Sequence, residues 1–305
     1  MMKVHVIVVG WNGDEWLPDC LGTLVTASSK RIHLILVDNH NNPGIPDLDL
    51  SGFETTILKT PEPLGFAEAN NYALVNADWD DDGLVLFLNQ DTRSSHGWID
   101  QCVDCFEASP ELGALSPGVR TLDDEDWDSA YQVCARNAVP VPDQGWQGVQ
   151  EITAAAMFVR ASVLWKTGPF DPIFESYYED YDLCRRIRAA GSLVGLVPEA
   201  RLYHFNGSIT RDAGSERRRM HWVARNRIIV RVREAGPARF QALLRSFCWT
   251  FPRNLLRGLL GRPSAQPVGV TLKVFCDLLR LAPRLASAKA DERAWRKYIE
   301  EIDWS

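Results

Sequence analysis

The sequence predicts an α/β fold, a mainly parallel β-sheet flanked by helices, followed by a basic helical extension. Through the first 200 residues, short apolar runs alternate with amphipathic segments. The apolar runs, such as Val4–Val9 and Leu84–Leu88, are continuous rather than alternating, which is typical of parallel strands buried on both faces. Beyond Arg211 the pattern is mostly helical.

Each element follows from periodicity and from Gly, Pro and Asp breakers. The expected strands are residues 4–9, 32–37, 55–58, 84–88 and 112–116, and the expected helices among them are 14–26, 65–76 and 97–108. Residues 121–150 are acidic and then rich in Pro and Gly, so we expect a long loop or hairpin over the sheet edge. Glu151–Arg160 is either a strand or a short helix. The expected later helices are 217–234, 238–260, 271–288 and 291–302.

Composition limits the class of protein. A chain of 305 residues with 46% hydrophobic content can bury a complete core. The seven cysteines are scattered and odd in number, so we expect no disulfide framework, and Cys102 and Cys105 lack the second pair that zinc would need. The first residues read as a strand rather than a signal peptide, and no stretch is long enough to span a membrane. We therefore expect a cytoplasmic protein, with peripheral attachment to the inner face of the cell membrane as an open alternative.

Charge divides the chain into two regions. Residues 217–297 contain 19 Arg and Lys against four Asp and Glu, whereas the remainder contains 14 against 36. We expect an acidic α/β domain over residues 1–212 and a basic helical region over 213–305. Arginines among Leu, Phe and Trp fit attachment to an anionic membrane, while packing on the first domain or on a second subunit is the alternative. Nucleic acid is not an expected partner, because the acidic body would repel it.

Polar side chains occupy the ends of several expected strands. These residues, each at or just after the end of an expected strand, are Asn12, Asp38, Asp91 and His204. Because ligands bind at the carboxyl ends of parallel strands, one site can collect these residues. Asp91 and His204, with oxygens of a diphosphate, would complete a Mg²⁺ or Mn²⁺ shell. A turn-capping Asp91 and a structural His204 are the alternatives.

A second acidic cluster begins a helix. Glu179, Asp180 and Asp182 precede apolar residues that share one helix face. One acid is enough to cap a helix, so three acids with flanking tyrosines favour a function. A carboxylate at the positive end of a helix stays ionised and can accept a proton. The two clusters together suggest an enzyme that displaces a nucleoside diphosphate from a sugar.

Seven ordered segments resemble the inverting family 2 glycosyltransferases of the GT-A fold, over about residues 3–230. Leu64–Asn71, with its Gly-Phe-Ala-x-x-Asn-Asn pattern, is most similar to the rhamnosyltransferase-like branch, which includes galactofuranosyltransferases. The other segments are Val8–Gly13, Leu36–Asn39, Leu88–Thr92, Gly168–Asp171, Glu179–Arg186 and His204–Ser208.

The resemblance implies a role for each matching residue. Asp91, the last acid of the Asp-x-Asp motif, and His204 would hold Mg²⁺ or Mn²⁺, and Asp180 would be the catalytic base. Glu179 and Asp182 would shape the acceptor pocket. The implied donor and nucleotide residues are Asn12, Asp38, Gly65, Asn70, Asn71 and Asn89. Asn89 replaces the first acid of the motif, which removes one charge from the metal site.

Aromatic residues in the 121–150 stretch suggest an acceptor surface. Trp127 and Trp146 could stack on the apolar face of a sugar, or simply anchor the loop. The expected reaction is inverting transfer of a sugar, most simply rhamnose from dTDP-rhamnose, to a hydroxyl of a cell-surface polysaccharide or lipid-linked glycan. The alternatives are a galactofuranosyl- or other hexosyltransferase and a non-catalytic glycan-binding module. A nucleotidyltransferase is disfavoured, because Gly10–Asp14 lacks Lys and Arg. A homo-oligomer stays open.

Overall fold

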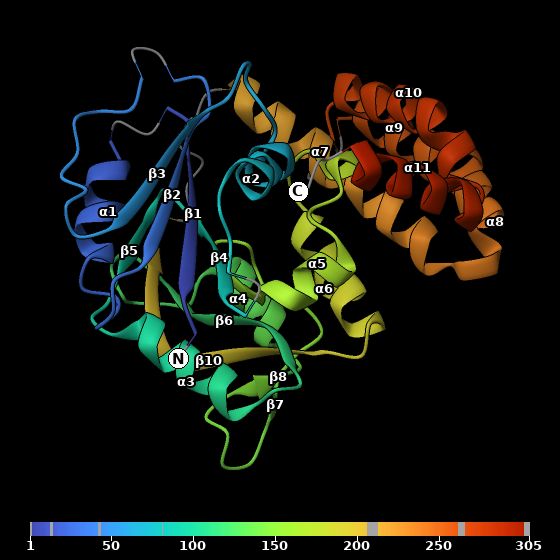
Figure 1. The fold of residues 1–305 in the computed structure, drawn as a ribbon. Helices are drawn as coiled ribbons and strands as arrows, with labels where there is room; N and C mark the ends of the chain where they lie inside the picture. The colour runs from blue at the N-terminus through green and yellow to red at the C-terminus, as the bar shows by residue number, and fades with distance from the viewer. Residues whose placement is uncertain are drawn as a thin grey trace. The chain divides into compact units, whose positions relative to one another are not determined.

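The computed structural model describes residues 2–12, 15–41, 44–80, 82–205, 213–261 and 266–301 (Figure 1). These residues form two compact units. The sheet unit contains the described residues up to 172 together with 179–205, and the helical unit contains 173–178 together with those from 213 onward. The predicted domain boundary at residue 212 lies outside the described residues and stays a prediction. Gly13, Gly207 and Ser208 of the expected motifs lie outside them too.

A ten-stranded sheet organises the sheet unit. Four parallel strands lie next to one another in the order β3 (Glu54–Lys59), β2 (His33–Asp38), β1 (Val4–Gly10) and β4 (Leu84–Asn89). The order continues with β9 (Ala156–Arg160), β6 (Leu112–Thr121), β10 (Leu193–His204), β8 (Gln147–Gly148) and β7 (Val139–Pro140), and β5 (Thr92–Ser94) pairs with β10. β9 is antiparallel to both of its neighbours, whereas β6 and β10 are parallel. The predicted α/β fold with a mainly parallel central sheet is confirmed, and the ambiguous 151–160 stretch ends in a strand.

Helices cover both faces of this sheet. One face packs on α1 (Leu17–Leu24) and α3 (Trp98–Ala108), and the other on α2 (Phe66–Asn76), α4 (Ser129–Ala135), α5 (Ala161–Thr167) and α6 (Glu179–Ala189). In β1, Val6 and Val8 enter one core while Ile7 enters the other, and all three are fully buried. Burying a side chain of this size contributes about 1.5–3 kcal/mol. Two covered faces are therefore the reason for the continuous apolar runs.

The carboxyl ends of the parallel strands meet at one edge of the sheet. Gly10 of β1 pairs with Asp38 of β2, and Val9 pairs with Asn89 of β4. A Cβ atom at Gly10 would lie 3.0 Å from the Leu17 side chain, so glycine lets α1 close on this edge. Three strand ends that the sequence singled out thus occupy one edge.

The 121–150 stretch, expected as a long loop or hairpin, contains the helix α4 as well as a short hairpin. Asp128 accepts hydrogen bonds from the N–H groups of Ala130 and Tyr131 (2.7 and 3.1 Å) and so caps α4. β7 and β8 then form a short hairpin. Trp146 packs against Gly195, where a Cβ atom would come within 2.7 Å of its ring. The stretch is thus anchored in the sheet unit.

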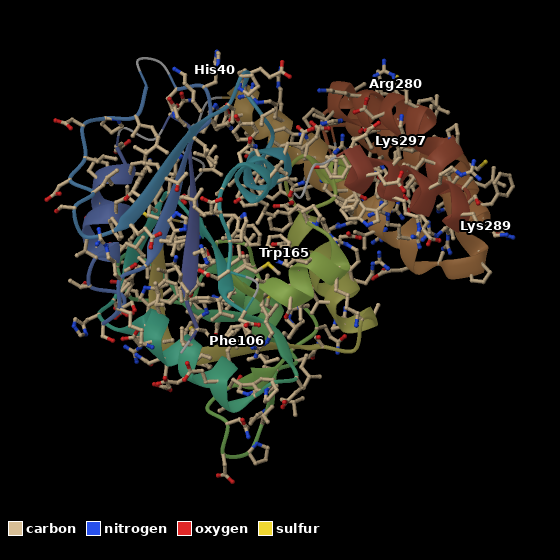
Figure 2. All side chains as sticks on the ribbon, viewed as in Figure 1. His40, Phe106, Trp165, Arg280, Lys289 and Lys297 are labelled. Carbon is tan, nitrogen blue, oxygen red and sulfur yellow. The ribbon has the colours of Figure 1, made fainter. Side chains whose placement is uncertain are left out.

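The helical unit consists mainly of α7 (Ala213–Glu234), α8 (Arg239–Arg245), α9 (Phe251–Leu259), α10 (Val268–Leu285) and α11 (Ala288–Glu301). A π-helical stretch, Ser246–Thr250, joins α8 to α9, so the helix predicted over 238–260 is interrupted. α10 packs against α7, α9 and α11 (Figure 1), and Arg280, Lys289 and Lys297 protrude from this unit (Figure 2). Across the described ranges, no helix combines the length and the apolarity needed to cross a bilayer.

Candidate active site

Asp91 and His204 meet at the carboxyl edge of the sheet. Asp91 follows β4, and the last residues of β10 pair with β5, which places His204 opposite Thr92. His204 Nε2 lies 3.3 Å from Asp91 Oδ1 and 3.5 Å from Asn89 Nδ2. The structure therefore brings together three residues that the sequence assigned to the cation and the donor.

Asp128 belongs to the same group, although the sequence did not identify it. Its carboxylate is 1% exposed; Oδ1 caps α4, and Oδ2 lies 3.1 Å from His204 Nδ1. Burial lowers the pKa of His204, but the carboxylates of Asp128 and Asp91 raise it more, to about 10. The helix-capping pattern was the available signal, yet nothing in it links residue 128 to residue 204. We call Asn89, Asp91, Asp128 and His204 the strand-end cluster.

The strand-end cluster fits a divalent cation that its substrate helps to hold. Among the described residues, no group of three or more His, Cys, Asp and Glu could enclose a metal by itself. Asp91 and His204 offer one oxygen and one nitrogen on facing atoms, provided that the cation displaces the proton that these carboxylates otherwise hold on the ring. The Asp128 carboxylate contacts the other ring nitrogen, Nδ1. Metal-binding histidines commonly make such a contact with a carboxylate through the nitrogen that does not bind the metal. Since Mg²⁺ usually keeps positions for water and phosphate oxygens, two protein ligands are sufficient.

Asp38 and Asn12 belong to a hydrogen-bonded group at the ends of β1 and β2. Oδ1 of the buried Asp38 accepts from the backbone N–H and the side-chain amide of Asn41 (3.0 and 2.7 Å). The Asn41 side chain also donates to the Gly10 carbonyl (2.8 Å) and accepts from the Asn12 N–H (2.6 Å). Asn41, which the sequence reading missed, thus links the two loops. Asn12 has a φ of +50°, which asparagine tolerates better than most residues.

Asp180 lies in the first turn of α6 and is half-buried beside the buried Glu179. Asp180 accepts from the Ala154 N–H through Oδ2 (3.2 Å) and from the Tyr181 N–H through Oδ1 (2.8 Å). Burial raises the pKa of Asp180, and these N–H groups oppose the shift. Burial, with the charge of Asp180, raises the pKa of Glu179 well above its usual range, and Glu179 Oε2 has no hydrogen-bond partner among the described residues. Asp180 is therefore the carboxyl group of the pair that ionises first and is the better proton acceptor at neutral pH.

Two links relate Asp180 to the strand-end cluster. The Asn89 N–H donates to the Ala155 carbonyl (3.0 Å), and Asp180 accepts from the N–H of the preceding residue. Cys134 of α4 lies within electrostatic range of both Asp180 and Asp128. The two acidic clusters therefore border the same short segment before β9.

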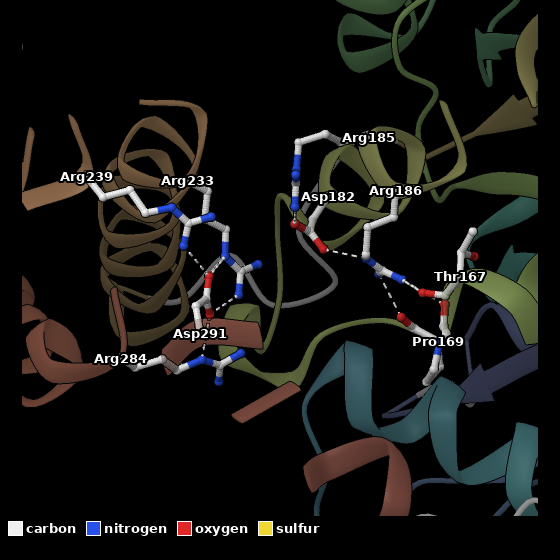
Figure 3. Close-up of polar contacts among 10 residues, drawn as sticks. Thr167, Pro169, Asp182, Arg185, Arg186, Arg233, Arg239, Arg284 and Asp291 are labelled. Carbon is white, nitrogen blue, oxygen red and sulfur yellow. Dashed lines mark hydrogen bonds and ion pairs between the residues drawn. The ribbon is translucent and has the colours of Figure 1, made fainter. Parts of the chain in front are cut away.

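Asp182 is buried in an ion-pair network, and the prediction that it shapes an acceptor pocket stays a prediction. Its carboxylate is 2% exposed and is held by Arg185 (3.1 Å) and Arg186 (2.8 Å), as Figure 3 shows. Arg186 also donates to the carbonyls of residues 167–169 at 2.7–2.8 Å. A buried carboxylate requires such partners, because leaving it unpaired is strongly destabilising. The ion pair fixes the turn after α5.

Trp146 and Asn71 are also buried and form hydrogen bonds inside the sheet unit. The Trp146 ring is 2% exposed and its N–H donates to the Ser109 hydroxyl (3.0 Å), so burial contradicts its expected stacking on a sugar. The Asn71 amide accepts from the Phe170 N–H (3.1 Å) and donates to the Phe170 carbonyl (2.8 Å). These hydrogen bonds give Asn71 a structural role, and its expected donor contact stays a prediction.

Gly65 and Asn70 lie at the N-cap and within α2, and Trp127 directly precedes the N-cap of α4. Gly65 is the N-cap of α2, and the buried Asn70 donates to the Phe66 carbonyl (2.9 Å). Trp127 is half-buried and stacks on Tyr131, with ring centroids 4.8 Å apart and an interplanar angle of 19°. The ligand contacts expected of Gly65, Asn70 and Trp127 stay predictions.

Comparisons with known proteins identify the family of the chain. The family model described as glycosyl transferase family 2 matches residues 5–167. The chain is 26% identical over 242 residues to an N-acetylglucosaminyl-diphospho-decaprenol L-rhamnosyltransferase of Mycobacterium tuberculosis (strain ATCC 25618 / H37Rv), covering 69% of this chain and 78% of that protein.

Two solved structures support the fold. S. aureus TarS 1-349 in complex with UDP has a TM-score of 0.55 at 14% identity, covering 93% of this chain and 82% of that one. The mannosyltransferase PcManGT from Pyrobaculum calidifontis, in complex with GDP-Man and Mn²⁺, has a TM-score of 0.54 at 16% identity, with 97% and 79% covered. The chain spans 50% of a longer TarS structure. These likenesses confirm the expected GT-A fold, and the family match covers more than half of the chain. The chain is therefore a glycosyltransferase that belongs to glycosyl transferase family 2.

Proposed function

We propose that this glycosyltransferase inverts the anomeric centre of its donor sugar and uses Asp180 as the general base. The observation that carries the proposal is the contrast between Asp180 and Glu179. Asp180 is half-buried and is held by two backbone N–H groups, whereas burial and the charge of Asp180 raise the pKa of Glu179 well above its usual range. A base whose pKa is raised by burial binds a proton more readily than an exposed aspartate does.

The donor that we propose is a nucleotide sugar, with dTDP-rhamnose as first choice. The support is the 26% identical relative, whose name specifies rhamnosyl transfer to a diphospho-decaprenol acceptor. Asp38 and Asn12 would contact the nucleotide, with Gly65, Asn70 and Asn89 toward the sugar and diphosphate. A galactofuranosyl or another hexosyl donor is the alternative. The proposed acceptor is a hydroxyl of a lipid-linked or cell-surface glycan.

The proposed cofactor is Mg²⁺ or Mn²⁺, held by Asp91 and His204 together with diphosphate oxygens. Mn²⁺ accompanies the donor in the mannosyltransferase structure that shares this fold. When bound, the cation supplies Lewis-acid stabilisation of the leaving diphosphate. Asp128 would keep the His204 ring oriented through Nδ1, so that Nε2 faces the ligand side.

The proposed reaction is a single displacement. Asp180 accepts the proton of an acceptor hydroxyl while that oxygen attacks the anomeric carbon on the face opposite the diphosphate. The bond between the anomeric carbon and the diphosphate oxygen breaks as the new glycosidic bond forms, and the configuration inverts. Glu179, as a neutral acid beside Asp180, would border the acceptor hydroxyl, and Trp127 could offer a ring to the acceptor sugar.

The test is the Asp180→Asn variant. Loss of a general base should lower the transfer rate about 10²–10⁴-fold. Donor affinity, measured by calorimetry with dTDP-rhamnose and Mn²⁺, should stay close to that of the unmodified protein. Asp19→Asn, at an exposed acid of α1, is the matched control and should leave both quantities unchanged. Undiminished transfer by Asp180→Asn, or an equal loss of binding and transfer, would remove Asp180 from this role.

A panel of nucleotide sugars tests the donor. Thermal shift with and without Mn²⁺ should give the largest stabilisation with dTDP-rhamnose, because a ligand that binds only the folded state raises its stability. A larger shift with another nucleotide sugar would replace rhamnose in the proposal and leave the role of Asp180 untouched.

A further inference from the structure

The surface of α9 and the preceding π-helical stretch is rich in large apolar side chains. Trp249, Leu256, Leu259 and Leu260 expose between 57% and 67% of their surface. Within residues 246–259, only Phe251 is buried. A surface helix normally turns its apolar side chains toward the core. Large apolar side chains exposed together mark a surface that contacts another apolar phase.

Spacing places most of these side chains on one stripe. Leu260 follows Leu256 by four residues, and Trp249 precedes Leu256 by seven, which brings all three to the same side of a helix. Arg253 and Arg257 are exposed and lie beside this stripe. Arg253 follows Trp249 by four residues, and Arg257 precedes Leu260 by three. We call Trp249, Arg253, Leu256, Arg257 and Leu260 the amphipathic face. It combines an apolar centre with a guanidinium edge.

The charge around this face has one sign. Between Glu234 and Asp277 the sequence contains six Arg and Lys and no acid. Arg253 and Arg257 form no ion pair within the described ranges, whereas two cations of α11 are paired, Arg296 with Glu292 and Lys297 with Glu301. The uncompensated positive charge therefore lies along the apolar stripe, where an external anionic surface could neutralise it.

We propose that the amphipathic face docks on an anionic lipid surface. Trp249, Leu256 and Leu260 enter the boundary between headgroups and acyl chains, and Arg253 and Arg257 contact lipid phosphates. Charge complementarity favours lipid over a second copy of the chain, because a two-fold interface would set this basic face against itself.

Helix α10, next to α9, also exposes apolar and basic side chains. On α10, which packs against α9, Leu272 and Leu279 are 49% and 50% exposed, and Lys273 is exposed between them. Docking needs neither sugar donor nor acceptor, so it goes beyond the proposed function and can be tested apart from it.

The experiment is sedimentation of the full chain with vesicles. Vesicles of phosphatidylcholine alone are compared with vesicles of equal parts phosphatidylcholine and phosphatidylglycerol, at low and high salt. The chain should sediment with the mixed vesicles and be released by salt, because the attraction to anionic lipid is screened. Each arginine near an anionic surface contributes about fivefold in partitioning, so Arg253→Gln/Arg257→Gln should bind roughly thirtyfold more weakly.

Matched variants separate this face from general surface effects. Trp249→Ser/Leu256→Ser should also lose binding, while Leu193→Ser, an exposed leucine of β10, should keep it. Lys289→Gln/Lys297→Gln removes two exposed cations of α11, both labelled in Figure 2, and should bind like the unmodified chain. Circular dichroism checks that every variant is folded.

Several outcomes would overturn the proposal. These are no binding to the mixed vesicles, equal binding to phosphatidylcholine alone, or equal losses in the Arg253/Arg257 and Lys289/Lys297 variants. A fourth outcome would come from analytical ultracentrifugation. If the chain is a dimer that Trp249→Ser/Leu256→Ser dissociates while vesicle binding is unchanged, the amphipathic face contacts a second copy of the chain. Sugar transfer to a soluble acceptor should be unchanged in these variants, so failure of docking is distinguishable from failure of the proposed function.

Discussion

Replacing Asp291 with asparagine should destabilise the helical unit severely. Asp291 is 5% exposed and accepts from Arg233 through both oxygens (2.9 Å each), from Arg239 (2.9 Å) and from Arg284 (2.8 Å), as Figure 3 shows. Asparagine has nearly the same size but no charge. The three guanidinium groups, whose side chains are between 5% and 22% exposed, would then lose their shared counter-charge.

The expected loss is about 3–5 kcal/mol, the usual cost of removing one partner from a buried ion pair. Arg233 carries most of it, because it is as buried as Asp291, whereas Arg239 and Arg284 lie nearer to water. Burial raises the pKa of Asp291, but the guanidinium groups of Arg233 and Arg284 lower it more, so the net shift is downward. A lowered pKa means that this stabilisation is present above the unfolded-state pKa and is lost as pH falls through the folded-state pKa.

Hydrogen exchange measured by mass spectrometry provides the assay, because it reports the stability of residues 213–301 separately from that of the sheet unit. Glu292→Gln, at the next residue of α11, is the control; its partner Arg296 is exposed, so little change is expected. In Asp291→Asn, exchange across α7, α10 and α11 should accelerate strongly. The stability of the helical unit should also fall less on acidification than it does in the unmodified chain. Equal exchange in the two variants would refute the reasoning.

Three further substitutions test other parts of the structure. Because burial raises the pKa of Glu179, the folded state holds a proton that the unfolded state releases near the ordinary value of 4.5. Stability should therefore fall as pH rises above that value, by up to about 1.4 kcal/mol per pH unit, and urea titrations of Glu179→Gln should lack this slope; parallel slopes would contradict it. Asp128→Asn should weaken Mn²⁺ binding about 10–100-fold by calorimetry, since His204 loses the partner of its Nδ1, and unchanged affinity would argue against a metal at His204. Asn226 donates to three carbonyls of the 173–178 segment at 2.7–2.8 Å, so Asn226→Ala should cost about 1–3 kcal/mol and speed hydrogen exchange there, with the exposed Gln241→Ala as control.

The fold was largely accessible from the sequence because its signals are local. A strand buried on both faces is expected to be apolar throughout, and β1 and β4 meet this expectation except at His5 and at the terminal Asn89. Parallel strands also share a carboxyl edge, which is why Asp38 and Asp91 could be assigned to one edge without knowing the strand order. The π-helical interruption at 246–250 has no comparable signal, since its residues are compatible with an ordinary α-helix.

Side-chain direction was less accessible. Asp180 and Asp182 are two residues apart, and residues with that separation do not face each other on a helix. The structure turns Asp182 toward Arg186. Trp146 follows the same logic on the hairpin, because only the position of Gly195, 49 residues further along the chain, makes room for its ring in the core.

Long-range pairing decides which charges are available for function. The sequence gives the helical region a large positive excess but does not distinguish one arginine from another. Arg233, Arg239 and Arg284 converge on Asp291 from up to 58 residues away, so their charge stabilises the interior of the helical unit. Arg253 and Arg257 occur in a stretch without acids and face outward beside exposed leucines. One compositional bias therefore has two physical roles: the arginines around Asp291 stabilise the interior of the helical unit, whereas Arg253 and Arg257 are placed to meet an anionic surface.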